Sequence, residues 1–246
     1  MVKFFSVPEF EQRCSACSIS ELCLPRGLRP MDVRRLETLV SSARPMSAGQ
    51  SLFAQGEPLR ALYVVSRGSM KTTVLDGNGL EQIVGFHYPG DLLGLDGVAN
   101  DVHVCAAVSL EASEFCRIPF ERLEQLTDQL PMLRRRLMRL MSRQLTLDDD
   151  LLMGLGSKSG EARLASWLLS CSRHGDRQDQ PRRSLQLSMS RGDLANFLGM
   201  RIETISRLFS RMDHLGVLRV RQRAVEILDF DRLSEWAGRA ARVADR

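Results

Sequence analysis

The chain has 246 residues, of which 43% are hydrophobic, enough for one large domain or two ordinary ones with buried cores. Its 34 Lys and Arg against 30 Asp and Glu give a net charge of only +4, so charge alone does not indicate a nucleic-acid partner. No apolar run approaches the roughly 20 residues that cross a bilayer, and the first ten residues lack the apolar stretch of a secretory signal. We therefore expect a cytoplasmic protein. In such a protein six cysteines favour a metal-binding or redox role over a disulfide framework.

The first half of the chain predicts one helix followed by a set of strands. The helix is expected at residues 30–40, where apolar side chains recur with a helical period. From Pro45, glycines separate short β-rich runs such as ALYVVSRGSMKTTVL and LEQIVGFHY, which end near ASEFCRIPF. Residues 76–79 contain Asp-Gly and Asn-Gly pairs, which supply the positive φ angles of a hairpin turn. This region predicts a small antiparallel roll or barrel.

A long helix is predicted next, because no Gly or Pro interrupts the chain between Pro131 and Gly154. Side chains at alternating spacings of three and four form a seam along one face of this helix, as in paired helices. One position of the seam, Asp148, is acidic, and opposing copies of Asp148 in a two-fold pair of helices would repel each other. We therefore expect a marginal dimer; the alternative is a helix that packs only on its own domain. The seam residues, which recur at alternating spacings of three and four, are Met138, Met141, Leu145, Asp148, Leu152 and Leu155.

Beyond that helix the sequence predicts a second domain. Gly154, Gly156 and Gly160 indicate a hinge, and residues 160–172 are expected to be helical. Residues 174–183 predict an exposed loop, and the remainder predicts the order helix, helix, hairpin, helix.

The segment from Ser190 to Gly216 predicts a helix-turn-helix. Ser190 and Asp193 have the form of a capping box, which starts a short helix. Gly199 ends that helix and allows a sharp turn, and a second helix is expected to begin near Ile202.

The second helix carries the candidate DNA-reading residues. Glu203 suits a cytosine amino group, and Arg207, four residues later, suits guanine. The alternative is a surface salt bridge between Glu203 and Arg207. The following hairpin carries Arg219, Arg221 and Arg223, which form a candidate wing for DNA phosphates. The wing and the helix-turn-helix pattern together favour DNA binding over the salt bridge. An apolar stripe of Ile202, Ile205, Leu208, Phe209 and Met212 leaves Arg201, Glu203, Thr204, Ser206 and Arg207 on the exposed face.

The cysteines predict a metal centre near the N-terminus. Cys14, Cys17 and Cys23 place three thiolates within ten residues, and a closed site needs a fourth. Cys105 and Cys171 lie in apolar contexts typical of buried structural thiols, whereas Cys116 ends the predicted roll. Spacing alone does not distinguish zinc from a [4Fe-4S] cluster.

Several motifs, spread over residues 14–225, make the chain resemble the FNR family of anaerobic transcription regulators, within the cyclic AMP receptor superfamily. They are CSACSISELCLP, EQIVGFHYPGDLLGLDG, FCRIPFERL, LPMLRRRLMRLMSR and MSRGDLANFLGMRIETISRLFSR, in that order. The resemblance implies an α+β fold: an antiparallel β-roll similar to cyclic-nucleotide-binding domains, a dimerisation helix and a winged helix-turn-helix. The expected domains are a cysteine-rich arm at 1–29, the roll at 30–130, the dimerisation helix at 131–156 and the DNA-binding domain at 157–246.

The resemblance also implies roles for individual residues. Ser18 and Leu22 match positions that tune oxygen sensitivity, and Leu145 and Asp148 match residues that couple cluster loss to dimer loss. The remaining matches are Cys14, Cys17, Cys23 and Cys116 as ligands of an oxygen-labile [4Fe-4S] cluster, and Glu203, Ser206 and Arg207 as readers of an inverted repeat resembling TTGAT and ATCAA.

The resemblance implies an oxygen-sensing regulator and not an enzyme. This regulator would bind DNA as a homodimer and contact RNA polymerase, and the turn at 76–79 is a candidate for the polymerase contact. No cyclic nucleotide is expected, because residues 94–97 lack the Gly-Glu-Leu turn and residues 103–107 lack the phosphate-binding Arg. Two alternatives are a zinc-stabilised DNA-binding regulator with another effector, and a thiol oxidoreductase that uses Cys14 and Cys17. No thioredoxin-like pattern surrounds that cysteine pair.

Overall fold

The protein was analysed as a computed structural model, which describes residues 14–42, 45–174 and 182–238. These residues form two compact units, one from the described parts of 1–75 and 86–141 and the other from those of 76–85 and 142–246. Among the helices of these ranges, none combines the length and apolar character needed to cross a membrane.

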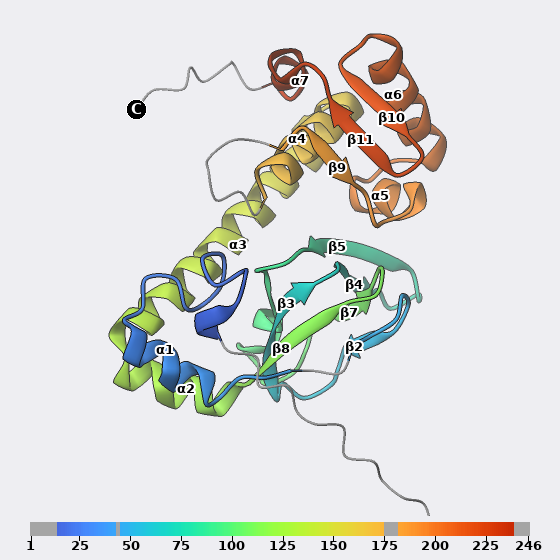
Figure 1. The fold of residues 1–246 in the computed structure, drawn as a ribbon. Coiled ribbons are helices and arrows are strands. Elements are labelled where there is room, and N and C mark those ends of the chain that lie inside the picture. Colours follow the sequence, from blue (N-terminus) through green and yellow to red (C-terminus); the bar gives the residue numbers. More distant parts are fainter. Residues whose placement is uncertain (1–13, 43–44, 175–181, 239–246) are drawn as a thin grey trace, which may run out of the picture. The chain divides into compact units, whose positions relative to one another are not determined.

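A β-roll with its flanking helices makes up most of the first unit (Figure 1), although residues 76–85, which include the first part of β5, are grouped with the second unit. Two four-stranded sheets have the orders β1-β8-β3-β6 and β2-β7-β4-β5, with antiparallel pairing between β3 and β8 and between β4 and β7. The predicted antiparallel roll is therefore confirmed. The elements are η1 (Cys14–Ala16), α1 (Pro30–Glu37), β1 (Ser41–Ser42), β2 (Ser51–Phe53), β3 (Ala61–Arg67), β4 (Met70–Leu75), β5 (Glu81–His87), β6 (Leu92–Leu93), η2 (Leu95–Gly97), β7 (Ala106–Ser109), β8 (Glu114–Pro119) and α2 (Phe120–Gln129).

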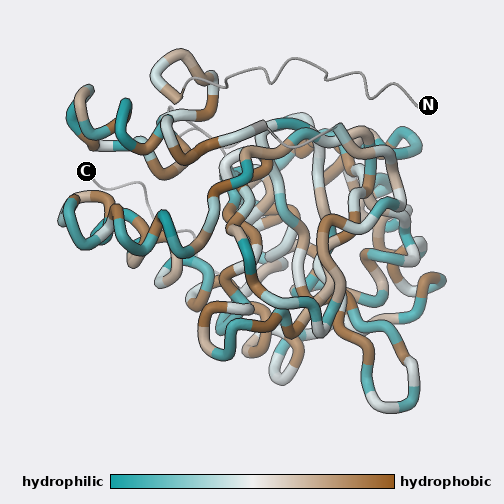
Figure 2. The backbone as a smooth tube through the Cα atoms, turned by 90° about the horizontal axis from the view of Figure 1, so that it is seen from below, coloured by the Kyte–Doolittle hydropathy of each residue, from teal (hydrophilic) through white to brown (hydrophobic). Residues whose placement is uncertain are grey.

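One hydrophobic cluster joins the roll to its helices and to the cysteine-bearing arm. Val64 and Ile118 of the central strands pack with Leu36 of α1, Leu133 of the long helix and Leu24 of the arm. Each such side chain contributes about 1.5–3 kcal/mol when it is fully buried. Figure 2 shows hydrophobic and hydrophilic residues alternating along the elements, as expected when each buries one face. The arm is thus part of the core of the first unit.

Two local predictions for the first helix and the roll need correction. The helix predicted at 30–40 ends at Glu37, and the amides of Leu39 and Val40 then close tighter turns on carbonyls three residues back. Within the turn at 76–79 only Gly79 has a positive φ, +79°. Asp76 shapes the rest of this turn, because its carboxylate accepts hydrogen bonds from the Leu80 and Asn78 amides, which lower its pKa.

The long helix α3 (Pro131–Ser157) confirms the prediction and extends one residue beyond it. It runs through Gly154 and Gly156, so of the three glycines expected at the hinge only Gly160 lies next to a break in the helices. The break lies at Lys158 and Ser159, where the Ser159 hydroxyl accepts the Ala162 amide and caps the next helix.

The second unit has the predicted order of helix, helix, hairpin and helix, together with one unpredicted strand, β9. The strand was missed because it has only three residues, too few for a periodic pattern. It pairs with β11, which gives a three-stranded sheet of order β10-β11-β9. Most of the loop predicted at 174–183 lies outside the described residues. The elements are α4 (Gly160–Arg173), β9 (Ser184–Gln186), α5 (Arg191–Phe197), α6 (Ile202–His214), β10 (Leu218–Arg221), β11 (Ala224–Ile227) and α7 (Phe230–Trp236).

Candidate DNA-binding surface and cysteine site

Local sequence signals set the two helices of the helix-turn-helix. The Ser190 hydroxyl accepts the Asp193 amide at 3.0 Å, and the Asp193 carboxylate accepts the Ser190 amide at 3.0 Å, a complete capping box. Gly199 has a φ of +61°, and a Cβ there would lie 3.2 Å from Leu155 and 3.3 Å from Arg163. Both conditions favour glycine, so the turn between α5 and α6 follows directly from the sequence.

The predicted faces of α6 are confirmed with two exceptions, Ile202 and Thr204. Ile202, expected in the apolar stripe, is 46% exposed because it is the first helical residue and precedes the turn that packs on α5. Thr204, expected on the exposed face, is half-buried. The buried members are Ile205, Leu208, Phe209 and Met212, and the exposed ones are Arg201, Glu203, Ser206 and Arg207.

The candidate base-reading side chains lie on the open face of α6. Arg207 Nε donates to the backbone carbonyl of Glu203 at 3.3 Å, and no ion pair joins the two side chains in the described structure. The Ser206 hydroxyl donates to the Ile202 carbonyl at 2.9 Å. The surface salt bridge that was the alternative to DNA reading is therefore not present, and the exposed carboxylate and guanidinium face solvent.

The strands β10 and β11 form the hairpin predicted as a wing. Its arginines differ in whether their side chains already have a hydrogen-bond partner within the protein. Arg219 pairs with Glu226 at 2.9 Å, and Arg223 donates to the Ser188 carbonyl at 3.1 Å. Arg221 is exposed.

The sequence did not single out Arg191. Its guanidinium lies 3.5 Å from the centre of the Phe209 ring and donates to the Gln222 carbonyl at 3.4 Å. Arg191 thereby connects α6 to the wing turn, and no pattern in the sequence indicates this contact.

Along α3, one set of leucines packs on the first unit, whereas most residues of the predicted seam are exposed. In the first turns of α3, Leu133, Leu137 and Leu140 pack on the core of the first unit, so the alternative of a helix packed on its own domain holds there. Farther along, Asp148 is exposed and accepts the Gln144 side-chain amide at 2.8 Å. Met141 is half-buried. The remaining seam residues are exposed in the single chain: Met138 by 64%, Leu145 by 65%, Leu152 by 66% and Leu155 by 37%.

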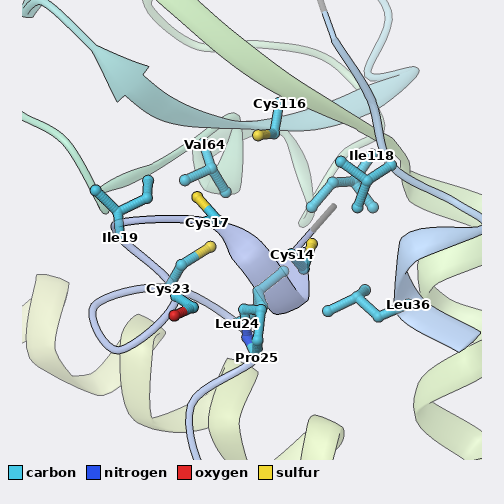
Figure 3. Close-up of a pocket in the computed structure, with 12 residues that line it drawn as sticks. Cys14, Cys17, Ile19, Cys23, Leu24, Pro25, Leu36, Val64, Cys116 and Ile118 are labelled. Atoms are coloured by element: carbon cyan, nitrogen blue, oxygen red, sulfur yellow. The ribbon is translucent and has the colours of Figure 1, made fainter. Parts of the chain in front are cut away.

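Four of the six thiols line one pocket in the first unit. Figure 3 shows Cys14, Cys17 and Cys23 of the arm on one side and Cys116 of β8 on the other. The rest of the lining is mainly apolar and includes Ile19, Leu24, Leu36, Val64 and Ile118. Neither Cys105, which packs with Phe53 and Phe115 in another hydrophobic cluster of the roll, nor Cys171 of α4 lines this pocket.

The pocket disfavours isolated thiolates. Burial raises the pKa of Cys14 to about 11, with a smaller contribution from the Glu37 carboxylate. Burial likewise raises the pKa of Cys23 and of Cys116 to about 12, and the neighbouring cysteines contribute to both shifts. An electropositive centre is what would stabilise four thiolates here.

The thiols line the walls of the pocket and do not meet at one point. Among the described residues, no three His, Cys, Asp or Glu side chains are arranged to hold a single metal ion. A tetrahedral zinc needs its sulfurs at about 2.3 Å from one centre. In a [4Fe-4S] cluster each cysteine binds its own iron, which spreads the ligands around a larger body. Four thiols that line one pocket are a donor set that suits either kind of centre.

A carboxylate occupies the part of the roll that corresponds to the superfamily's cyclic-phosphate segment. Asp96 accepts the amides of Val104 at 2.9 Å and Cys105 at 3.2 Å, and lies 3.3 Å from His103 Nδ1. The His103 ring stacks on Phe53 with centroids 3.8 Å apart. An anion entering this segment would meet a negative group rather than an arginine.

Comparison with known proteins identifies both halves. Residues 43–129 match the model of the cyclic nucleotide-binding domain, and residues 162–236 match that of the Crp-like helix-turn-helix domain. Over 231 residues the chain is 39% identical to the fumarate nitrate reduction regulatory protein of Klebsiella oxytoca, covering 94% of the chain and 92% of the relative. It is 38% identical to the transcriptional activator protein anr of Pseudomonas aeruginosa, covering 96% of each. Among solved structures, FixK2 from Bradyrhizobium japonicum has a TM-score of 0.73 at 25% identity, covering 83% of this chain and 99% of that one.

Proposed function

The chain belongs to the FNR family of transcription regulators, and from this premise we propose that it is an oxygen sensor whose [4Fe-4S] cluster controls dimerisation and DNA binding. As a family member it is a DNA-binding transcription regulator for the anaerobic response and not an enzyme. The observation that carries the proposal is the pocket lined by four thiols from the arm and from β8.

Cys14, Cys17, Cys23 and Cys116 would hold the cluster, which supplies the reactivity toward oxygen when bound. Their mainly apolar surroundings limit access of water, and the raised pKa values of Cys14, Cys23 and Cys116 mean that binding releases protons. The Ser15 amide and hydroxyl both bind the Glu37 carboxylate at 2.7 Å, which ties the first ligand turn to α1. A structural zinc at the same cysteines is the rival, and metal analysis separates the two.

The route from the cysteines to the dimer runs along α3. The arm and the first turns of α3 share one hydrophobic cluster, and the exposed Leu145 and Asp148 lie farther along the same helix. An arm that is ordered by the cluster would hold α3 in a position that favours pairing despite Asp148 repulsion. Loss of the cluster would remove that support and return the protein to monomers.

The dimer would present two copies of α6 to an inverted repeat resembling TTGAT and ATCAA, with Glu203, Ser206 and Arg207 at base edges. Thr204 and Arg201 would lie toward the backbone of the DNA. The exposed turn at 76–79 is a proposed contact for RNA polymerase. In domain terms, we propose the arm at 1–29, the roll at 30–130, the dimerisation helix at 131–156 and the DNA-binding domain at 157–246.

The test of the ligand set is the iron content of protein purified without oxygen. Wild type should hold close to four irons per chain, with a visible absorption that air bleaches. Cys116→Ser should lose the iron, whereas Cys171→Ser, a matched change in α4, should retain it. One zinc per chain in colourless wild type, or full iron in Cys116→Ser, would contradict the proposal.

A further inference from the structure

An arginine of the long helix holds the backbone of the cysteine arm. Arg136 of α3 donates from Nε to the Cys23 carbonyl and from Nη2 to the Leu22 carbonyl, each at 3.0 Å. Its planar fork suits two neighbouring acceptors, and a lysine would supply only a point charge. The contact lies inside the first unit, and Arg136 is half-buried.

One of these two residues, Leu22, also contacts the roll. A Cβ on Gly90, in the turn before β6, would lie 2.7 Å from the Leu22 Cβ, and Gly90 has a φ of +100°. Leu22 therefore sits directly against the backbone of that turn. Leu22 contacts the roll at Gly90 and α3 through Arg136, and Cys23 contacts α3 through the same Arg136 side chain, so a displacement of Cys23 disturbs its bond to Arg136.

The turn itself offers little alternative support for these carbonyls. The Cys23 carbonyl also accepts the Arg26 amide, but at 3.4 Å, close to the limit of a hydrogen bond. Carbonyls outside regular structure have no helix or sheet partner, and here the helix side chain supplies donors to those of two half-buried residues. Hydrogen bonds from a charged donor are also stronger than neutral ones.

We infer that Arg136 is a positioning residue that sets the Cys23 ligand and transmits the state of the cysteine site to α3. The inference rests on the proposed function and deepens it, because it identifies the side chain through which the arm acts on the helix. A shift of Cys23 on gain or loss of a metal centre would change both hydrogen bonds to Arg136. That side chain lies one residue before Leu137 and two before the exposed Met138, where the seam begins.

The first experiment tests the contact without iron. In full-length, reduced, metal-free protein, hydrogen exchange at the amides of residues 22–24 and 26 should be about tenfold faster in Arg136→Met, because charge-assisted hydrogen bonds are lost. Arg136→Lys should give an intermediate rate, and the amides of β8 should not change. Arg135→Met, an exposed neighbour on the same helix, is the control. Equal protection in the Arg135 and Arg136 variants would overturn the positioning role.

The second experiment tests transmission to the dimer. Iron-loaded Arg136→Met at the same iron content as wild type should show a monomer-dimer dissociation constant about tenfold higher, an effect absent from Arg135→Met. Unchanged dimerisation at equal iron content would overturn transmission. If wild type takes up no iron, the proposed function fails and transmission fails with it, while the exchange rates still decide whether Arg136 positions the arm.

Discussion

At the residue scale, we propose that the exposed side chains of α6 and of its N-cap divide into a base-reading role and a phosphate-binding role. Glu203 and Arg207 are one turn apart on its exposed face, with no ion pair between them in the described structure, so their polar groups remain available. Arg201 precedes the helix as its N-cap residue and is also exposed. A base contact carries sequence information, whereas a phosphate contact carries charge.

Substitution of two arginines should distinguish these roles. Arg207→Ala should weaken binding to the inverted repeat by about 1–3 kcal/mol and relax specificity at the matching base pair. Arg201→Ala should weaken binding to all sequences similarly and reduce the slope of log affinity against log salt by about 1. Titration of matched and mismatched duplexes at several salt concentrations measures both. Equal losses on every sequence for Arg207→Ala would contradict base reading.

The two cysteines outside the pocket should differ in reactivity. Burial raises the pKa of Cys105, and the nearby Asp96 carboxylate raises it further. The thiolate fraction at pH 8 therefore falls below that of an ordinary cysteine, and alkylation becomes slow. Iodoacetamide should modify the partly exposed Cys171 before Cys105, as peptide mass spectrometry would show. Faster modification of Cys105 would contradict its buried position.

At the element scale, the capping box determines the start of α5. Ser190→Ala should lower the free energy of unfolding by about 1 kcal/mol, because the Asp193 amide loses its acceptor. Ser210→Ala, an exposed change inside α6, should alter it by less than about 0.5 kcal/mol. Denaturant unfolding of both variants gives the comparison. Equal stability of the two would show that the cap contributes little.

The acidic position on α3 should limit the dimer. Asp148→Ala removes the charge that opposing helices would bring together, so a larger dimer fraction is expected in air. Asp149→Ala, the adjacent exposed acid, is the control for net charge. Sedimentation at several protein concentrations measures both. An unchanged monomer fraction in Asp148→Ala, or an equal shift in Asp149→Ala, would contradict the seam assignment.

At the scale of the whole molecule, local signals made much of the fold predictable. The capping box at Ser190 and the glycine at 199 located the helix-turn-helix to within a residue, because each acts on its own backbone. The strands of the roll followed from glycine-bounded β-rich runs. Gly154 misled the hinge prediction, because a helix tolerates glycine when its neighbours pack well, and this glycine is buried.

Features that depend on contacts distant in the sequence could not be predicted. Arg136 and Cys23 are 113 residues apart, and Arg191 contacts the wing 31 residues away. Nothing in a run of similar arginines on α3 marks Arg136 as the one that meets the arm. Spacing alone likewise left the fourth thiol open among three cysteines. Only the folded roll brings Cys116 to the pocket of the arm.

The central claim is that the cysteine site controls association, and one measurement tests it directly. Sedimentation velocity of anaerobic, iron-loaded protein should show a dimer, and the same sample after exposure to air should show a monomer as its visible absorption bleaches. A dimer that survives full bleaching would contradict the account.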